Sequence, residues 1–125
     1  MKGRDLTGQA SVYASEPEIK MSGFDRRKAY TVVMLDPDAP AGTWTHYVAT
    51  VNADGSVLAK QYGYQAPNPP KGSGRHRYIF TLYDELKEIS QGTGQETGTA
   101  YYTRVLKPLL TKYKPIADPV QFTLL

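Results

Sequence analysis

The sequence predicts a mainly β fold, because short apolar or alternating runs separated by turn residues dominate it and helical periodicity is scarce. A length of 125 residues argues for one domain over residues 1–125. A chain of this size buries roughly two-thirds of its unfolded surface in one core. The sequence contains no Cys, which rules out disulfide frameworks, thiolate metal sites and cysteine nucleophiles.

Seven runs have the composition of strands: residues 9–13, 18–21, 30–35, 46–51, 57–62, 76–83 and 119–124. The run over residues 30–35 is almost continuously apolar, which is typical of a central strand covered on both faces. Between two β-rich runs, residues 52–55 predict a hairpin turn in which Gly55 supplies a positive φ.

Two glycine-containing stretches between these runs predict loops of different kinds. Residues 66–74 contain three prolines, which remove backbone donors, and two glycines, which permit unusual φ values. That stretch therefore predicts a stiff, shaped loop. Residues 91–99 place glycines among polar residues with no apolar residue, so we expect a mobile surface loop there.

One helix is expected, somewhere inside residues 100–113. Its apolar stripe consists of Tyr102, Val105, Leu106, Leu109 and Leu110. Pro108 lies inside that stripe, so it either kinks the helix or starts a second one at its first turn.

The positive charge of the chain is concentrated in one short stretch. The chain has 15 Lys and Arg against 12 Asp and Glu, a net charge of +3. Residues 65–83 carry three bases, Lys71, Arg75 and Arg77, and no acid. A nucleic-acid groove usually has a longer basic face with interleaved aromatic residues. We therefore expect a small anion pocket and no nucleic-acid partner.

Targeting and membrane segments are not evident in the sequence. No apolar run approaches the roughly 20 residues that a membrane span needs. The first five residues lead into no apolar stretch of the kind that a signal peptide has. We therefore expect a cytoplasmic protein, and no basic amphipathic helix supports more than transient contact with a membrane.

Residues that could carry chemistry stand at the ends of the expected strands. Asp36 and Asp38 follow the apolar strand, and the remaining candidates are Trp44 with His46 and His76 with Tyr78, each pair at strand spacing. Taken singly, each has an ordinary structural explanation as a turn or core residue. Taken together, carboxylate, imidazole and phenol form a set that binds a phosphate or carboxylate group, because the acid orients the imidazole and the imidazole and phenol donate to the anion.

Two blocks of sequence resemble the phosphatidylethanolamine-binding protein family, also called the Raf kinase inhibitor protein family. They stand in the family's order and are joined by the expected hairpin: Asp36-Pro37-Asp38-Ala39-Pro40 with Trp44-Thr45-His46, then Pro69-Pro70-Lys71-Gly72-Ser73-Gly74-Arg75-His76-Arg77-Tyr78. The match is close from Tyr30 to Tyr83 and looser elsewhere. The resemblance implies a Greek-key β-sandwich with one or two short peripheral helices. It also implies a compact member that lacks the C-terminal helix of mammalian relatives.

The resemblance also implies an anion pocket at the strand ends. Carried over by position, the pocket residues are Asp36 and His46 at the floor, Asp38 as a brace, Pro40, Trp44 and Pro70 at the walls, His76 and Tyr78 as donors, and Asn68, which stands where relatives often have Gly. The peptide between Ala39 and Pro40 matches one that is cis in relatives. Arg77 is expected to be structural, because the strand period turns it away from the site.

The function that the resemblance implies is non-enzymatic binding. The ligand would bear a phosphate, as a phospholipid head group or as a phosphorylated partner, and the protein would modulate kinase signalling without a cofactor. Two alternatives stay open: a serine protease inhibitor, or a phosphoester hydrolase using Asp36, His46 and His76. The connection of residues 41–43 is short, and Thr43 replaces an acid of some relatives, so the pocket mouth is expected to be open and less acidic.

Overall fold

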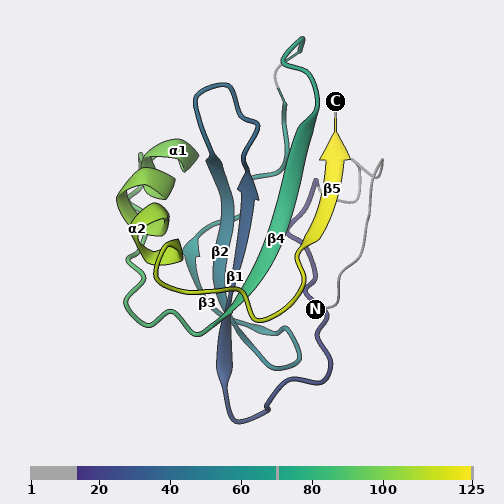
Figure 1. The fold of residues 1–125 in the computed structure, drawn as a ribbon, viewed down its shortest axis with the longest axis vertical. Coiled ribbons are helices and arrows are strands. Elements are labelled where there is room, and N and C mark those ends of the chain that lie inside the picture. Colours follow the sequence, from purple (N-terminus) through teal and green to yellow (C-terminus); the bar gives the residue numbers. More distant parts are fainter. Residues whose placement is uncertain (1–13, 70, 125) are drawn as a thin grey trace.

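The chain folds around one antiparallel sheet, with strands in the order β3-β2-β1-β4-β5 (Figure 1). The computed structural model describes residues 14–69 and 71–124. Its strands are β1 (Ala29–Asp36), β2 (Trp44–Asn52), β3 (Val57–Tyr62), β4 (His76–Asp84) and β5 (Val120–Leu124). Strands β1 to β3 are sequential neighbours and β4 returns beside β1, which is the Greek-key order. The expectation of a mainly β fold is confirmed.

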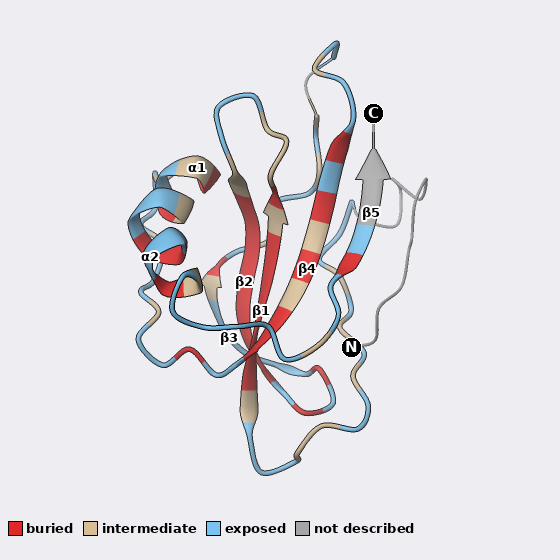
Figure 2. Ribbon diagram, in the orientation of Figure 1, coloured by how far each residue is buried: buried red, intermediate tan, exposed pale blue. Residues whose placement is uncertain are grey.

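Strand β1 is the central strand, as its apolar sequence predicts. Val32, Val33 and Met34 are fully buried. Because successive side chains alternate, Val32 and Met34 join the core on one face of the sheet and Val33 joins the core on the other. Figure 2 shows the burial running along β1 and β2, whereas the edge strand β3 is mostly exposed.

A short helical segment covers one face of the sheet. It runs through α1 (Gly98–Tyr101), a π-helical turn over Tyr102–Leu106, and α2 (Lys107–Leu110). Its buried residues pack against the face of Val33: Tyr101, Val105, Leu106 and Leu109. In the described part of the chain no helix is long and apolar enough to cross a membrane.

Pro108 lies in the first turn of α2, directly after the π-helical turn over Tyr102–Leu106, which is wider than an α-helical turn. At the end of that turn the N–H of Lys107 bonds to the carbonyl of Tyr102, five residues back. A proline has no N–H to give and crowds the carbonyl four residues before it, and a wider turn is one way a helix relieves that conflict. The structure thus matches the second of the two roles expected for Pro108, at the start of a helix.

The opposite face of the sheet is covered by the segment that precedes β1. Ile19, Met21 and Phe24 pack against the core there, but residues 18–21 form no strand, so that prediction is wrong. The β2–β3 turn packs closely against the same segment. A Cβ added to Gly55 would lie only 1.9 Å from the carbonyl oxygen of Ile19. Gly55 has the expected positive φ of 96°. The strand expected at residues 9–13 lies outside the described residues.

Residues 91–97 form a largely exposed loop, as predicted, but the loop ends at α1 and is tied to the helical segment. Glu96 forms an ion pair with Arg104 at 2.6 Å, and only 8% of its side chain is exposed. The hydroxyl of Thr97 accepts the N–H of Ala100 and caps α1, and Gly98 is the first residue of that helix. Composition alone did not predict these ties, because they depend on where the helix begins and on which of its faces Arg104 occupies.

Candidate functional site

The candidate residues meet at one end of the sheet, where β1 ends and where β2 and β4 begin. Asp36 is the last residue of β1 and pairs in register with Trp44, the first residue of β2. His76 is the first residue of β4, the other neighbour of β1. The Greek-key order therefore brings together residues from two separate blocks of the sequence.

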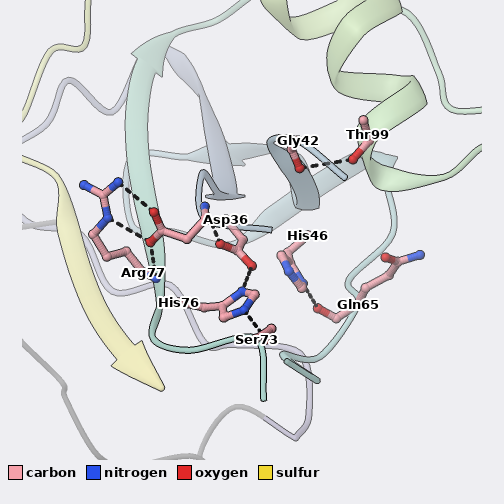
Figure 3. Close-up of polar contacts among 9 residues, drawn as sticks. Asp36, Gly42, His46, Gln65, Ser73, His76, Arg77 and Thr99 are labelled. Carbon is pink, nitrogen blue, oxygen red and sulfur yellow. Dashed lines mark hydrogen bonds and ion pairs between the residues drawn. The ribbon is translucent and has the colours of Figure 1, made fainter. Parts of the chain in front are cut away.

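A buried imidazole and a buried carboxylate form the centre of this site. The Nδ1 atom of His76 lies 2.6 Å from Oδ2 of Asp36, and their side chains are 1% and 4% exposed. A carboxylate only accepts, so Nδ1 carries the proton and donates. The other ring nitrogen, Nε2, lies 2.7 Å from the hydroxyl oxygen of Ser73 (Figure 3). Ser73 stands three residues before His76 in the second of the two sequence blocks, and no site role was predicted for it.

His46 is held by a residue that the sequence analysis also missed, Gln65. The Nδ1 atom of His46 lies 2.6 Å from the backbone carbonyl oxygen of Gln65, and the N–H of Gln65 donates to the carbonyl of His46 at 2.8 Å. The side-chain oxygen of Gln65 accepts the indole N–H of Trp44 at 2.8 Å. Gln65 thus fixes two candidate residues, and no local motif in the sequence marks it.

Burial lowers the pKa of His46, and the nearby imidazole of His76 acts in the same direction. The hydrogen bond to Gln65 and the charge of Asp36 oppose that shift. The neutral form is therefore favoured in the unliganded protein. Because Nδ1 donates to a carbonyl, the neutral ring carries its lone pair on Nε2.

The phenol of Tyr78 touches both imidazoles. Its ring centroid lies 5.2 Å from that of His46, edge to face at 77°, and 6.3 Å from that of His76, nearly parallel at 18°. Tyr78 is fully buried, and burial raises its pKa. The phenol therefore stays protonated at neutral pH and keeps its O–H donor.

Asp38 lies behind the site and is engaged by Arg77. Its carboxylate accepts two guanidinium hydrogen bonds at 2.9 Å and the backbone N–H of Arg77 at 2.8 Å. The guanidinium holds the pKa of Asp38 below its usual range. The backbone N–H of Asp38 donates to Oδ1 of Asp36 at 2.8 Å. Arg77 is exposed and ion-paired, in agreement with the structural role expected of it.

Two further candidate residues lie at the surface. Pro40 and Asn68 are exposed, and Pro70 lies outside the described residues. Every peptide bond between described residues is trans, including the one before Pro40, so the cis peptide implied by the resemblance is not found.

The wall that carries Trp44 is backed by the start of α1. The hydroxyl of Thr99 donates to the carbonyl of Gly42 at 3.2 Å. A Cβ on Gly98 would lie 2.4 Å from the indole of Trp44 and 2.6 Å from the carbonyl oxygen of Thr45. Helix α1 therefore sets the position of this wall, a link that crosses more than 50 residues of sequence.

The site combines two imidazoles and a phenol with two carboxylates that already have partners. Across the described ranges, no group of three or more His, Asp or Glu side chains is spaced to hold a metal ion. Both ring nitrogens of His76 are engaged, by Asp36 and by Ser73, whereas His46 uses only Nδ1. The donor that the arrangement can offer an added group is therefore Nε2 of His46 in its protonated form, which suits an anion.

Comparison with known proteins gives one family. A family model described as phosphatidylethanolamine-binding protein matches residues 1–114. The chain is 27% identical over 116 residues to the protein BROTHER of FT and TFL 1 of Arabidopsis thaliana, covering 86% of this chain and 64% of that protein. It is 34% identical over 86 residues to carboxypeptidase Y inhibitor of Saccharomyces cerevisiae, covering 48% of this chain and 39% of that protein.

A solved structure shares the fold. The phosphatidylethanolamine-binding protein from Plasmodium vivax superposes with a TM-score of 0.70, covering 96% of this chain and 76% of that chain at 19% identity. The chain spans 64% and 39% of the lengths of the two curated relatives above.

Proposed function

The chain belongs to the phosphatidylethanolamine-binding protein family, and from that premise we propose that it is a binding protein whose site takes a phosphate-type anion. The observation that carries the proposal is the placement of two imidazoles against one buried phenol, Tyr78. The neighbouring carboxylates do not oppose an anion strongly, because Asp36 bonds to His76 and Asp38 bonds to Arg77.

His46 is the donor that an anion would engage first. Its Nδ1 is used by Gln65, so Nε2 is the ring nitrogen left to reach a ligand. Protonated at Nε2, the ring donates a charge-assisted hydrogen bond to a phosphate oxygen. Lys71 and Arg75, exposed on the loop that leads into β4, add positive charge to that side of the molecule.

Phosphate groups reach such a site from two sources, a lipid head group or a phosphorylated side chain. Capture of a phosphorylated side chain would connect the protein to kinase signalling. The shared chemistry is a phosphate monoester or diester oxygen. Separate titrations with inorganic phosphate, phosphoethanolamine and phosphoserine distinguish the sources.

The test follows the imidazole signals of His46 and His76 by NMR during these titrations. Trp44 is the only Trp of the chain, so its fluorescence gives a second reading of the same site. We expect the His46 signals to move and saturate, and His46→Gln to abolish saturation. Chloride at matched ionic strength is the control. Titrations that move neither imidazole would overturn the proposal.

A second candidate function rests on one comparison, the 34% identity with carboxypeptidase Y inhibitor. The matched part is 48% of this chain. An inhibition assay with purified carboxypeptidase Y tests it directly. The His46→Gln variant separates the two functions, because loss of anion binding with inhibition retained assigns inhibition to another surface.

A further inference from the structure

Three side chains at one edge of the site form a hydrogen-bonded chain that does not include His46, the donor assigned to the anion. The hydroxyl oxygen of Ser73 lies 2.7 Å from Nε2 of His76, and Nδ1 of His76 lies 2.6 Å from Oδ2 of Asp36. We propose that Ser73, His76 and Asp36 form a nucleophilic centre that reacts with small activated esters. This activity is separate from the proposed anion binding and does not rest on it.

The order of the atoms is what nucleophilic catalysis by a serine needs. Because Nδ1 of His76 donates to the carboxylate, the neutral ring has its lone pair on Nε2, facing the hydroxyl of Ser73. The imidazole can then take the hydroxyl proton as the oxygen attacks. Both contacts are within the 2.6–3.2 Å that this role requires.

The base and the acid are buried, whereas Ser73 lies partly at the surface. His76 is 1% exposed and Asp36 is 3% exposed. The second oxygen of Asp36 accepts the N–H of Asp38 at 2.8 Å, which fixes the plane of the carboxylate. Ser73 is half-buried in the loop before β4, so a small substrate can approach its hydroxyl.

The backbone around Ser73 supplies a second feature. Gly72 has a φ of 83° and Gly74 a φ of 85°, whereas Ser73 between them has a negative φ. Alternating φ signs permit a nest, in which successive N–H groups turn toward one side and attract an anion. Such donors stabilise the oxyanion that forms when a hydroxyl adds to an ester carbonyl.

The chemistry balances with water as the only co-reactant. The Ser73 oxygen bonds to the ester carbonyl carbon while its proton passes to Nε2 of His76. The tetrahedral intermediate then breaks its bond to the alcohol oxygen, which takes that proton and leaves an acyl-serine. Water attacks the acyl-serine by the same route, so that ester and water become acid and alcohol.

The experiment incubates the full chain with p-nitrophenyl acetate and maps the acetyl adduct by peptide mass spectrometry. We expect an adduct on Ser73 that Ser73→Ala removes and that the control Ser56→Ala leaves unchanged. Ser56 suits this control because its hydroxyl donates to Asp54 in a turn instead of to an imidazole. His76→Gln should slow the labelling of Ser73 roughly 100-fold or more, the usual contribution of a general base.

If His76→Gln fails to fold, the pH profile of the wild-type protein decides instead. Labelling of Ser73 should rise with pH and level off as one base loses its proton. A purely structural role for the Ser73 hydroxyl predicts no adduct, or a rate equal to that of Ser56 and flat with pH, and either result overturns the proposal. The phosphate titration of the wild-type protein, followed at the His46 signals, tests the anion site separately, so failure of one proposal is distinguished from failure of the other.

Discussion

The Nδ1 atom of His46 lies 2.6 Å from the backbone carbonyl oxygen of Gln65. A carbonyl only accepts, so this contact fixes the proton on Nδ1 in both charge states of the ring. The neutral ring then presents a lone pair at Nε2 and repels an anion there. To bind an anion at Nε2, His46 must take up a proton.

Anion affinity should therefore rise as the pH falls. Burial lowers the pKa of His46, so the ring is mostly neutral at pH 8 and its protonation is part of the binding reaction. We expect the affinity for sulfate, which does not titrate in this range, to rise by up to about tenfold per pH unit, the limit for uptake of one proton. Calorimetry in buffers of different ionisation enthalpy measures that uptake, and affinity independent of pH in the wild type would contradict the assignment.

The free energy of unfolding of the unliganded protein should fall, not rise, as the pH falls. The pKa of His46 is lower in the folded chain than in the unfolded chain, so between these two values the unfolded chain binds more protons. The free energy of unfolding should fall as the pH drops below about 6.5, by no more than about 1.4 kcal/mol per pH unit from this residue. Urea unfolding at pH 7 and pH 5.5 measures it. His46→Gln should reduce the slope, and an unchanged slope would show that other groups cause it.

The sequence predicted the sheet from local patterns, and it predicted from the family resemblance which residues gather at one end of that sheet. The apolar run of residues 30–35 marks a strand covered on both faces, and β1 occupies the centre of the sheet. In an antiparallel pair, the last residues of one strand lie beside the first residues of its neighbour. Periodicity alone does not reveal which strands are neighbours. The resemblance of the two blocks that contain Asp36 and His76 to the family predicted that their strands lie side by side.

The placement of His46 could not be predicted from strand alternation. Met34 pairs with Tyr47 and Leu35 pairs with Thr45, so His46 is the extra residue of a β-bulge. Strict alternation would turn His46 and Tyr47 to opposite faces. Instead the His46 ring contacts Tyr78, which shares a core with Tyr47. Bulges depend on the register of both strands, which a single run of residues does not reveal.

Helix α1 and the single Trp give a second testable link. Substituting Gly98 by Ala would place a Cβ 2.4 Å from the Trp44 indole, although Ala favours a helix over Gly. We expect a net loss of about 1–3 kcal/mol from overpacking and a shift of Trp fluorescence. The control Gly94→Ala has nothing within 4 Å of its Cβ and should change neither. Equal stability of the two variants would mean that α1 yields without moving Trp44.

A side chain at Gly55, in the β2–β3 turn, should be tolerated worse than one at Gly23, which has a similar φ. Gly55 and Gly23 both have a positive φ, 96° and 84°, but a Cβ on Gly55 would lie 1.9 Å from the Ile19 carbonyl oxygen. Gly23→Ala should cost about 1–2 kcal/mol from its conformation alone. Gly55→Ala should cost roughly 1–3 kcal/mol more, and urea unfolding measures both. Similar losses would show that the segment before β1 moves away freely.

The ion pair between Glu96 and Arg104 should hold residues 91–97 against the helical segment. Two guanidinium hydrogen bonds, at 2.6 and 2.7 Å, lower the pKa of Glu96 to about 2. The pKa of this carboxyl is below its unfolded value, so its contribution is complete above about pH 4.5 and is lost as the pH falls toward 2. Glu96→Gln keeps the shape of the side chain and removes its charge.

We expect Glu96→Gln to lower the melting temperature at pH 7 and to speed amide exchange in residues 91–97. The difference from the wild type should shrink as the pH approaches 2, because the wild-type carboxyl then becomes neutral too. Glu85→Gln, at an exposed position, is the matched control and should leave both measurements unchanged. Exchange in residues 91–97 as slow in Glu96→Gln as in the wild type would show that the Thr97 cap and the packing of Gly98 hold this segment without the ion pair.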